Sequence, residues 1–243
     1  MSTGAPLVAP LTWRLECHEE LGSTSDHLLD RAAAGEAEGL AVLAHRQTAG
    51  RGRDGRSWRG EVGNLHISLL LRPGGPARLA PQWGLIAAVA LHDALAPFVP
   101  GGVAFTLKWP NDLMLGGAKL AGMLCESSTD ATGHIEWLVI GLGANLAQAP
   151  AVEGRATACL PGRPAPEVVA APLLDRVAHW RLRYLREGFA PIRAAWEARG
   201  PAPDAALVLR GGLAGGYRGL SESGSLLIAA GGTVHAVMSG EVD

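Results

Sequence analysis

The sequence of 243 residues has very little lysine: only Lys108 and Lys119 occur among its 21 basic residues, and the others are arginines. Asparagine is equally scarce and occurs only as Asn64, Asn111 and Asn145. Arginine carries a wide planar cation, whereas lysine carries a compact point charge. We therefore expect a retained lysine to occupy a place that arginine does not fit, and both lysines lie within twelve residues of each other, on either side of Asn111.

Other scarcities exclude whole classes of protein. The three cysteines, Cys17, Cys125 and Cys159, form no CxxC pair, which argues against a disulfide framework and fits a reducing compartment. The net charge of −2 argues against a general nucleic-acid or membrane-surface binder. The N-terminus lacks the pattern of a signal peptide, and the longest apolar run, residues 85–91, is too short to span a bilayer. We expect a soluble cytoplasmic protein.

The order of secondary-structure signals predicts two domains. Up to residue 200, strands are expected at 11–16, 40–45, 64–72, 103–109 and 135–146, and helices at 27–34, 82–95, from Pro172 onward and at 192–198. Beyond residue 200, short strands alternate with glycine-rich turns, which is typical of a small β-barrel. We therefore expect a domain of residues 1–200 that mixes helices and strands, followed by a β domain of residues 201–243.

A hairpin is predicted around Gly116-Gly117, because a pair of glycines between two short apolar strands favours a two-residue turn. With the turn centred on these glycines, Met114 faces Lys119. Asp112 then lies on the same face as Lys119 and diagonally across from it, within reach of a long side chain. The hairpin thus predicts a carboxylate and a rare lysine in one space.

Residues 50–58 (GRGRDGRSW) predict an anion-binding loop, since glycines let backbone N–H groups approach an anion and guanidinium groups bind carboxylate or phosphate. Trp58 adds a face on which a base stacks. A solvated arginine-rich loop or an RGG-like segment that touches RNA are the alternatives. The near-neutral chain argues against RNA, because such affinity depends largely on counterion release by many cations.

The segment Lys108-Trp109-Pro110-Asn111-Asp112 brings together a cation, an amide and a carboxylate, a set that can hold a nucleotide and its Mg²⁺. A proline corner with an aspartate turn cap is the alternative. Asn145 is a further candidate, or simply the polar end of a strand. The eight histidines show no HxH or HxxxH spacing, so no catalytic transition metal is expected.

These motifs together resemble the biotin protein ligases. The resemblance rests on Ser23-Thr24-Ser25, Gln47 to Arg53, Lys108 to Leu113, Lys119 to Gly122, Gly141 to Asn145 and Ser239 to Val242, in the family's order and spacing. It implies an α+β fold with a class II synthetase-like mixed sheet covered by helices, and a C-terminal SH3-like β-barrel. It also implies an enzyme that activates biotin with ATP to biotinyl-5′-AMP and transfers it to a lysine of a biotin carboxyl-carrier domain of acetyl-CoA carboxylase or a related carboxylase.

The resemblance also implies roles for individual residues. Those implied to bind biotin are Ser23, Thr24, Ser25, Gln47, Gly50, Arg51, Gly52, Arg53, Lys119 and Gly122. Those implied to bind ATP are Arg51, Arg53, Arg56, Trp58, Lys108, Asn111, Asp112, Lys119 and Asn145. Catalysis would rest on Lys119, Arg51, Arg53 and Asp112, and Asp112 would hold Mg²⁺ through ATP phosphates or water.

Departures from the family's pattern and rival functions accompany the resemblance. Ser25 stands where asparagine is common in the family, Asp54 interrupts the arginines, and Gly116-Gly117 loosens the hairpin tip.

Because the Ser-Thr motif begins at Ser23, we expect no DNA-binding domain before it and no repressor role. We expect the protein to be a monomer or a homodimer. The rivals are a lipoate or octanoate ligase or transferase of the same fold, which the arginine-rich loop disfavours, and an RNA-binding module.

Overall fold

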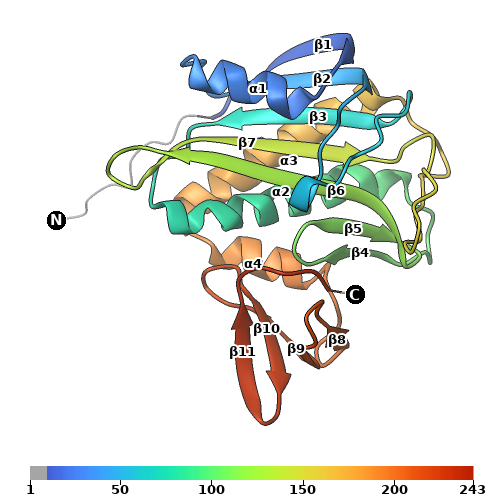
Figure 1. Cartoon of the computed structure of the whole chain (residues 1–243), viewed down its shortest axis with the longest axis vertical. Helices are drawn as coiled ribbons and strands as arrows, with labels where there is room; N and C mark the ends of the chain where they lie inside the picture. The colour runs from blue at the N-terminus through green and yellow to red at the C-terminus, as the bar shows by residue number, and fades with distance from the viewer. Residues whose placement is uncertain (1–9, 243) are drawn as a thin grey trace.

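The computed structural model describes residues 10–242 and contains a seven-stranded mixed sheet with helices on both faces (Figure 1). The strand order is β1-β2-β3-β7-β6-β5-β4, and only β1 and β2 run parallel. The strands are β1 Arg14–Leu21, β2 Leu40–Gln47, β3 Leu65–Leu71, β4 Phe105–Lys108, β5 Asp112–Leu115, β6 Ala118–Thr129 and β7 Ile135–Ala144. The expected α+β architecture with a mixed sheet is confirmed.

Helix α1 (Thr24–Ala33) covers one face of the sheet near β2, β3 and β7. Ser23 begins the helix, because its side chain accepts a hydrogen bond from the Asp26 N–H at 3.2 Å. Gly35, with a φ of 89°, follows the end of the helix as a residue that tolerates this conformation. Leu28, on the apolar side of α1, packs on Val42 and Val139. This packing places α1 on the sheet face that also carries the pocket described below.

Helices α2 (Ala80–Leu95) and α3 (Pro166–Glu187) cover the opposite face, and α4 (Ala190–Glu197) packs beside them. Helix α2 is apolar on nearly all sides because it lies between the sheet and α3. Among the described residues, the stretch Ala77–Phe98 is long and apolar enough to cross a membrane, although most of it is buried in this core. The longest uninterrupted apolar run, residues 85–91, covers only part of this stretch, and for that reason no membrane-spanning segment was expected from the sequence.

The expected start of α3 at Pro172 is wrong, because the helix begins at Pro166 and Pro172 lies inside it. Both prolines are compatible with a helical φ, and Pro166 occupies the first turn, where no N–H is needed. Pro172 has no N–H and therefore cannot donate the usual hydrogen bond to the carbonyl four residues earlier. The buried side of α3, including Leu173, Val177 and Trp180, outweighs that loss.

The last strands form a separate four-stranded antiparallel sheet in the order β11-β10-β9-β8. They are β8 Ala206–Val208, β9 Ala214–Leu220, β10 Leu226–Ala230 and β11 Thr233–Val237. This sheet is consistent with the expected SH3-like domain. Figure 1 shows it below α4, and the chain after β11 returns toward the edge of the large sheet formed by β4 and β5. The C-terminal segment thereby reaches the candidate site.

Candidate functional site

A cavity of about 530 Å³ lies on the face of the large sheet that carries α1. Its floor is made of glycines on the paired strands β6 and β7, where Gly122 faces Gly143 and Leu124 faces Gly141. A Cβ atom on Gly143 would overlap the ring of Trp58, and one on Gly141 would overlap the Ser25 hydroxyl. The glycines thus leave room for groups that lie directly on the sheet.

The segment at the start of α1 forms a buried polar end of the cavity. Gln47 Oε1 accepts hydrogen bonds from the Thr24 N–H at 2.7 Å and the Thr24 hydroxyl at 2.9 Å. The hydroxyls of Thr24 and Ser25 lie 2.8 and 3.0 Å from the hydroxyl of Ser68. Ser68 was not among the residues predicted from the sequence. Its signal was a polar residue in a strand in which all other residues except His66 are apolar.

The glycine- and arginine-rich loop between β2 and β3 closes back on itself and crosses the cavity side of the sheet (Figure 1). The Trp58 N–H donates to the Gly50 carbonyl at 2.9 Å, and the Gly52 N–H donates to the Arg56 carbonyl at 2.7 Å. At its tip Asp54 has a φ of 56°, which aspartate tolerates better than most residues. The loop is therefore held by its own backbone hydrogen bonds.

The arginines of this loop each contact a different acceptor. Arg51 forms two hydrogen bonds of 2.9 Å to the Glu126 carboxylate, and its hydrogen bonds with Glu126 raise the pKa of Arg51. Arg53 donates to the Asn111 side-chain oxygen at 3.4 Å and to the Gly240 carbonyl at 3.2 Å. Arg53 thus connects the loop to both the β4–β5 corner and the C-terminal segment.

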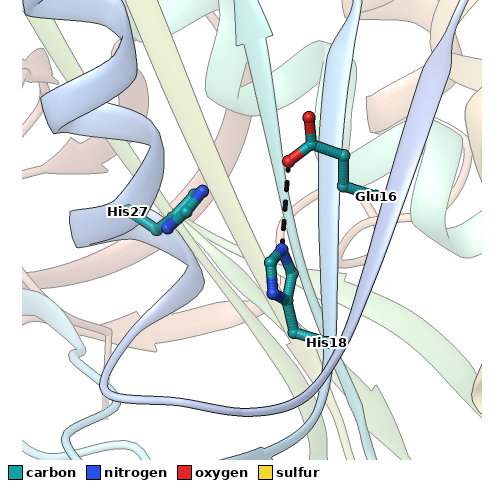
Figure 2. A group of neighbouring side chains, drawn as sticks. All are labelled: Glu16, His18 and His27. Carbon is teal, nitrogen blue, oxygen red and sulfur yellow. Dashed lines mark ion pairs between the residues drawn. The ribbon is translucent and has the colours of Figure 1, made fainter.

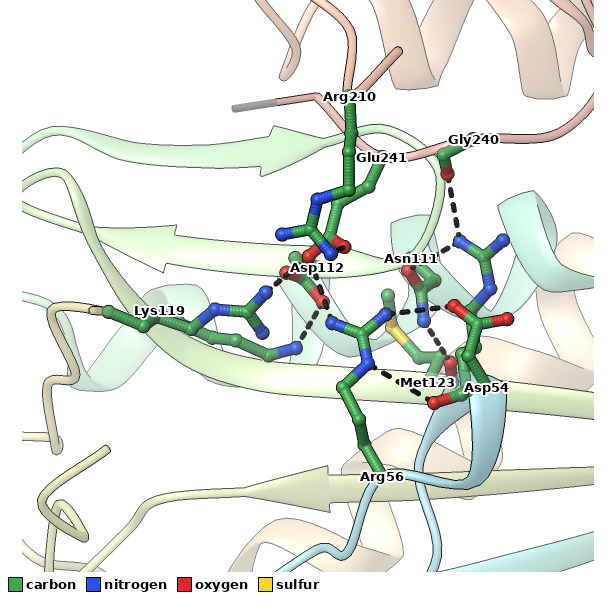
Figure 3. Close-up of polar contacts among 11 residues, drawn as sticks. Asp54, Arg56, Asn111, Asp112, Lys119, Met123, Arg210, Gly240 and Glu241 are labelled. Atoms are coloured by element: carbon green, nitrogen blue, oxygen red, sulfur yellow. Dashed lines mark hydrogen bonds and ion pairs between the residues drawn. The ribbon is translucent and has the colours of Figure 1, made fainter. Parts of the chain in front are cut away.

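Glu241 lies at the cavity mouth among three guanidinium groups, those of Arg56, Arg155 and Arg210. Figure 3 shows Arg56 and Arg210 converging on this carboxylate from different segments of the chain. Burial alone would raise the pKa of Glu241, but the arginines outweigh it and lower the pKa. Glu241, Arg155 and Arg210 were given no role from the sequence, although Glu241 lies in a motif that carried the resemblance.

Lys119 contacts Asp112 directly, as the hairpin geometry predicted (Figure 3). Met114 faces Lys119 as expected, but a bulge at Leu120 then shifts the register, so that Asp112 faces Gly122. Burial lowers the pKa of Lys119, the Asp112 carboxylate opposes this, and Arg155 and Arg56 lower the pKa further. The result is a mostly buried cation paired with one carboxylate at the cavity wall.

Two buried polar atoms in the cavity lack hydrogen-bond partners among residues 10–242, namely Trp58 Nε1 and Asn145 Oδ1. Asn145 is oriented by its amide group, which donates to the Ala158 carbonyl at 3.1 Å. Trp58 lies on the glycine floor, and Lys119 Nζ is 5.7 Å from its ring. A buried polar atom without a partner is costly, so these atoms indicate a place where ligand groups bind.

Most of the predicted site residues line this one cavity. Lys108 and Gly50 do not line it: Lys108 lies on β4 opposite Asp112, and Gly50 packs tightly beneath the Trp58 backbone. Asn64, which had no predicted role, accepts hydrogen bonds from the N–H groups of Ala147 and Gln148 and fixes the segment after β7. Cys125 is partly buried and packs against the hydrophobic core, and burial raises its pKa to about 12.

Known proteins resemble this chain in both sequence and structure. Residues 21–145 match the model of the biotin/lipoate A/B protein ligase family. A biotin–[acetyl-CoA-carboxylase] ligase from Paracoccus denitrificans is 40% identical over 199 residues, which cover 77% of this chain and 82% of that protein. A biotin protein ligase from Aquifex aeolicus in complex with biotin and ATP has a TM-score of 0.78 and 27% identity, covering 95% of this chain and 97% of that one. The Leishmania major ligase in complex with biotinyl-5-AMP has a TM-score of 0.62 and 25% identity, covering 93% of this chain and 99% of that one.

Proposed function

The chain belongs to the biotin/lipoate A/B protein ligase family and is a biotin protein ligase, and from that premise we propose how its cavity carries out the reaction. The enzyme activates biotin with ATP to biotinyl-5′-AMP and then transfers biotin to a protein lysine. The observation that supports the following roles most strongly is the buried Lys119–Asp112 pair beside an arginine loop and a glycine floor. The lipoate alternative is not favoured, since the relatives are biotin ligases.

Biotin binds at the polar end of the cavity beside α1. Its ring system offers hydrogen-bond donors and acceptors that match the hydroxyls of Ser23, Thr24 and Ser25 and the amide of Gln47. The glycine floor lets a flat bicycle lie against the sheet. In this orientation the biotin side chain runs toward Lys119, which lines the same cavity.

In the first step a biotin carboxylate oxygen attacks the α-phosphorus of ATP. The bond from that phosphorus to the bridging oxygen breaks, and pyrophosphate leaves. Negative charge grows on the α-phosphate oxygens, where Lys119, Arg51 and Arg53 supply compensating charge in a site with little water. Asp112 holds the Lys119 ammonium in place and opposes the loss of its proton on burial.

In the second step the amine of the acceptor lysine attacks the biotinyl carbonyl, and AMP leaves with the bonding electrons. The loop carrying Arg51 and Arg53 holds the mixed anhydride away from water until the acceptor arrives. Trp58 packs near the adenine, while Asn111 and Asn145 line the nucleotide site. The unpaired Oδ1 of Asn145 supports this role, because an adenine or ribose donor would satisfy it.

The site also fits Mg²⁺ bound together with ATP. Mg²⁺ is usually held by one or two carboxylates and by substrate phosphates, and the Asp112 carboxylate lies among the cations proposed to contact those phosphates. Asp112 would hold the ion directly or through water. The ion would neutralise phosphate charge and make pyrophosphate a better leaving group.

The acceptor is proposed to be a biotin carboxyl-carrier domain, and the enzyme is proposed to act in the cytoplasm as a monomer or a homodimer. Free Cys17, Cys125 and Cys159 support a reducing compartment. Sedimentation equilibrium with and without biotin and ATP would decide the oligomeric state.

Biotin-dependent exchange of labelled pyrophosphate into ATP tests the proposed first step directly. Exchange should require both biotin and Mg²⁺ and should not occur when lipoate replaces biotin. Adding purified apo carrier domain should then give a biotinylated lysine and AMP. Exchange with lipoate at a rate equal to that with biotin would contradict the assignment of the polar end to the biotin ring.

A further inference from the structure

A second group of metal-ligating side chains lies outside the ligase cavity, between β1 and α1. Glu16 and His18 leave the same face of β1, and His27 leaves α1 toward them (Figure 2). One ligand atom from each residue lies within 4.8 Å of the others. Glu16 Oε2 and His18 Nε2 are 3.9 Å apart. We propose that Glu16, His18 and His27 form a binding site for one divalent transition-metal ion of the Zn²⁺ class.

The two histidines are oriented as unused ligands. The Nε2 atoms of His18 and His27 are both buried, and neither has a hydrogen-bond partner in the described part of the chain. The rings face each other, with centroids 5.3 Å apart and planes inclined by 55°. Leaving two buried nitrogens unpaired costs free energy, and a shared ion satisfies both at once.

The backbone positions make the cluster a stable scaffold. Residues 16 and 18 are two apart on a strand and therefore share one face, and β1 is hydrogen-bonded along its length to β2. Helix α1 packs on β2, β3 and β7. A Zn²⁺ ion with bonds of about 2.0–2.1 Å needs ligand atoms roughly 3.3 Å apart in a tetrahedral arrangement. The ligand atoms lie within 4.8 Å of one another, so binding requires them to approach one another by up to about 1.5 Å.

The ligand set determines the kind of ion. Two imidazole nitrogens and one carboxylate oxygen suit Zn²⁺ and its neighbours, whereas Mg²⁺ and Ca²⁺ prefer oxygen ligands only. Arg31 Nη1 lies 3.4 Å from Glu16 Oε2, whereas Arg31 Nη2 lies 2.5 Å from Glu36 Oε2. The contact with Glu16 is the longer of the two, and the Glu16 carboxylate would give it up on turning toward the ion.

The position of the site gives the ion a structural consequence. The ligands bracket the turn that carries Ser23, Thr24 and Ser25, because His18 lies before this turn and His27 lies after it. An ion bound to both sides ties β1 to the first turn of α1. It thereby reduces opening of the segment that lines the polar end of the ligase cavity. The paired-histidine spacings HxH and HxxxH do not reveal this site, because its ligands come from two elements.

The test uses the untagged full-length chain without nucleotide, titrated with Zn²⁺ in competition with a chromophoric zinc indicator. One Zn²⁺ should bind per chain, and His18→Gln and His27→Gln should each weaken binding by at least about tenfold, the lower range for changes around a metal site. Hydrogen exchange of residues 14–33 should slow on addition of Zn²⁺ to the wild type and not to either variant. Circular dichroism verifies that the variants are folded.

His45→Gln and Cys17→Ser are the matched controls. His45 also pairs with a carboxylate, Glu167, at 3.3 Å, but these two residues belong to no group of three metal-ligating side chains in the described part of the chain. Cys17 lies between Glu16 and His18 on the other face of β1. Both controls should bind Zn²⁺ as the wild type does. Absence of binding to the wild type, retention of binding in both histidine variants, or a thiolate charge-transfer band on Co²⁺ substitution would overturn the proposal.

Discussion

At the scale of single residues, Lys119 is a buried cation whose neighbours closely surround its ammonium group. Only 13% of its side chain is exposed, and it lies between Asp112 and the ring of Trp58. Lys119→Arg should fold but lose adenylation by about 10²–10³-fold, the range for loss of one transition-state donor. The planar fork does not fit a space shaped for a point charge. Biotin-dependent pyrophosphate exchange measures the loss.

Lys108→Arg is the control for this substitution, since Lys108 does not line the cavity. This variant should keep exchange within a few-fold of the wild type, whereas a loss as large as that of Lys119→Arg would mean that Lys108 also contacts the substrates. Near-normal exchange by Lys119→Arg would contradict the role given to Lys119. Circular dichroism of both variants separates a lost contact from a lost fold.

The Asp112 carboxylate should control the pH range in which Lys119 is charged. Burial lowers the pKa of Lys119 and Asp112 opposes this, so Asp112→Asn should lower that pKa further. Because the ammonium form is the active one, exchange falls as pH rises through the pKa. The alkaline limb of the pH–rate profile should therefore lie at lower pH in Asp112→Asn than in the wild type.

The quantity to compare is the pH at which the rate falls along the alkaline limb, and not the maximal rate, since Asp112→Asn is also expected to reduce the rate. Asp175→Asn, an exposed position on α3, should leave the limb where it is. A limb that stays in place in Asp112→Asn would show that the titrating group is not Lys119, and a limb at higher pH would reverse the sign of the proposed interaction.

Residues of a rare type, or paired with one, were predicted to take part in the site, whereas some residues of frequent types were not. Lys119 and Asp112 were paired from the sequence, because the turn glycines fixed which residues face each other. Ser68 and Glu241 were not predicted to take part. Serine occurs more often in this chain than lysine or asparagine, so rarity does not single out Ser68. Nothing in the sequence near Glu241 reveals that arginines from three distant segments surround it. Such contacts depend on tertiary structure and have no local pattern.

At the scale of elements, the paired strands β6 and β7 form a floor that only glycine permits. A Cβ atom on Gly143 would overlap the Trp58 ring, which must then move. Overpacking of this kind typically costs about 1–3 kcal/mol. Gly143→Ala should therefore lower kcat/KM for exchange by roughly tenfold or more, since about 1.4 kcal/mol corresponds to tenfold, and should change Trp58 fluorescence.

Gly162→Ala is the matched control, because a Cβ atom there meets nothing within 4 Å and the backbone is not left-handed. It should leave both exchange and fluorescence unchanged. If Gly143→Ala retained full kcat/KM, the floor would tolerate a methyl group. The close approach of ligand rings to β7 would then not be needed for binding.

Elements were predicted best where the signal was local. The end of α1 and the glycine turn of the β5–β6 hairpin each depend on signals within a few residues, and they lie close to where they were expected, whereas α1 begins at Thr24, three residues before the expected start. The bulge at Leu120 was not predicted. A bulge depends on how β6 pairs with β7 as well as with β5, and this pairing is not local. The start of α3 was misplaced because two prolines compete for the first turn.

At the scale of the whole molecule, the C-terminal segment that follows β11 supplies a residue to the mouth of the catalytic cavity. Arg53 donates to the Gly240 carbonyl, and Leu209 pairs with Val242 through a backbone bridge. These contacts bring Glu241 to Arg56, Arg155 and Arg210. The carboxylate thus occupies a cluster of guanidinium groups that would otherwise attract phosphate.

Glu241→Gln should make the enzyme bind pyrophosphate more tightly, because it removes a negative charge that competes for these arginines. The inhibition constant of pyrophosphate in the transfer reaction should fall several-fold, since an exposed ion pair contributes up to about 1 kcal/mol. Raising the salt concentration should reduce the difference. Glu187→Gln removes an equal charge from an exposed pair with Arg183 on α3 and should leave the constant unchanged. An equal or higher inhibition constant in Glu241→Gln would mean that the carboxylate orders the arginines for phosphate and does not compete with it.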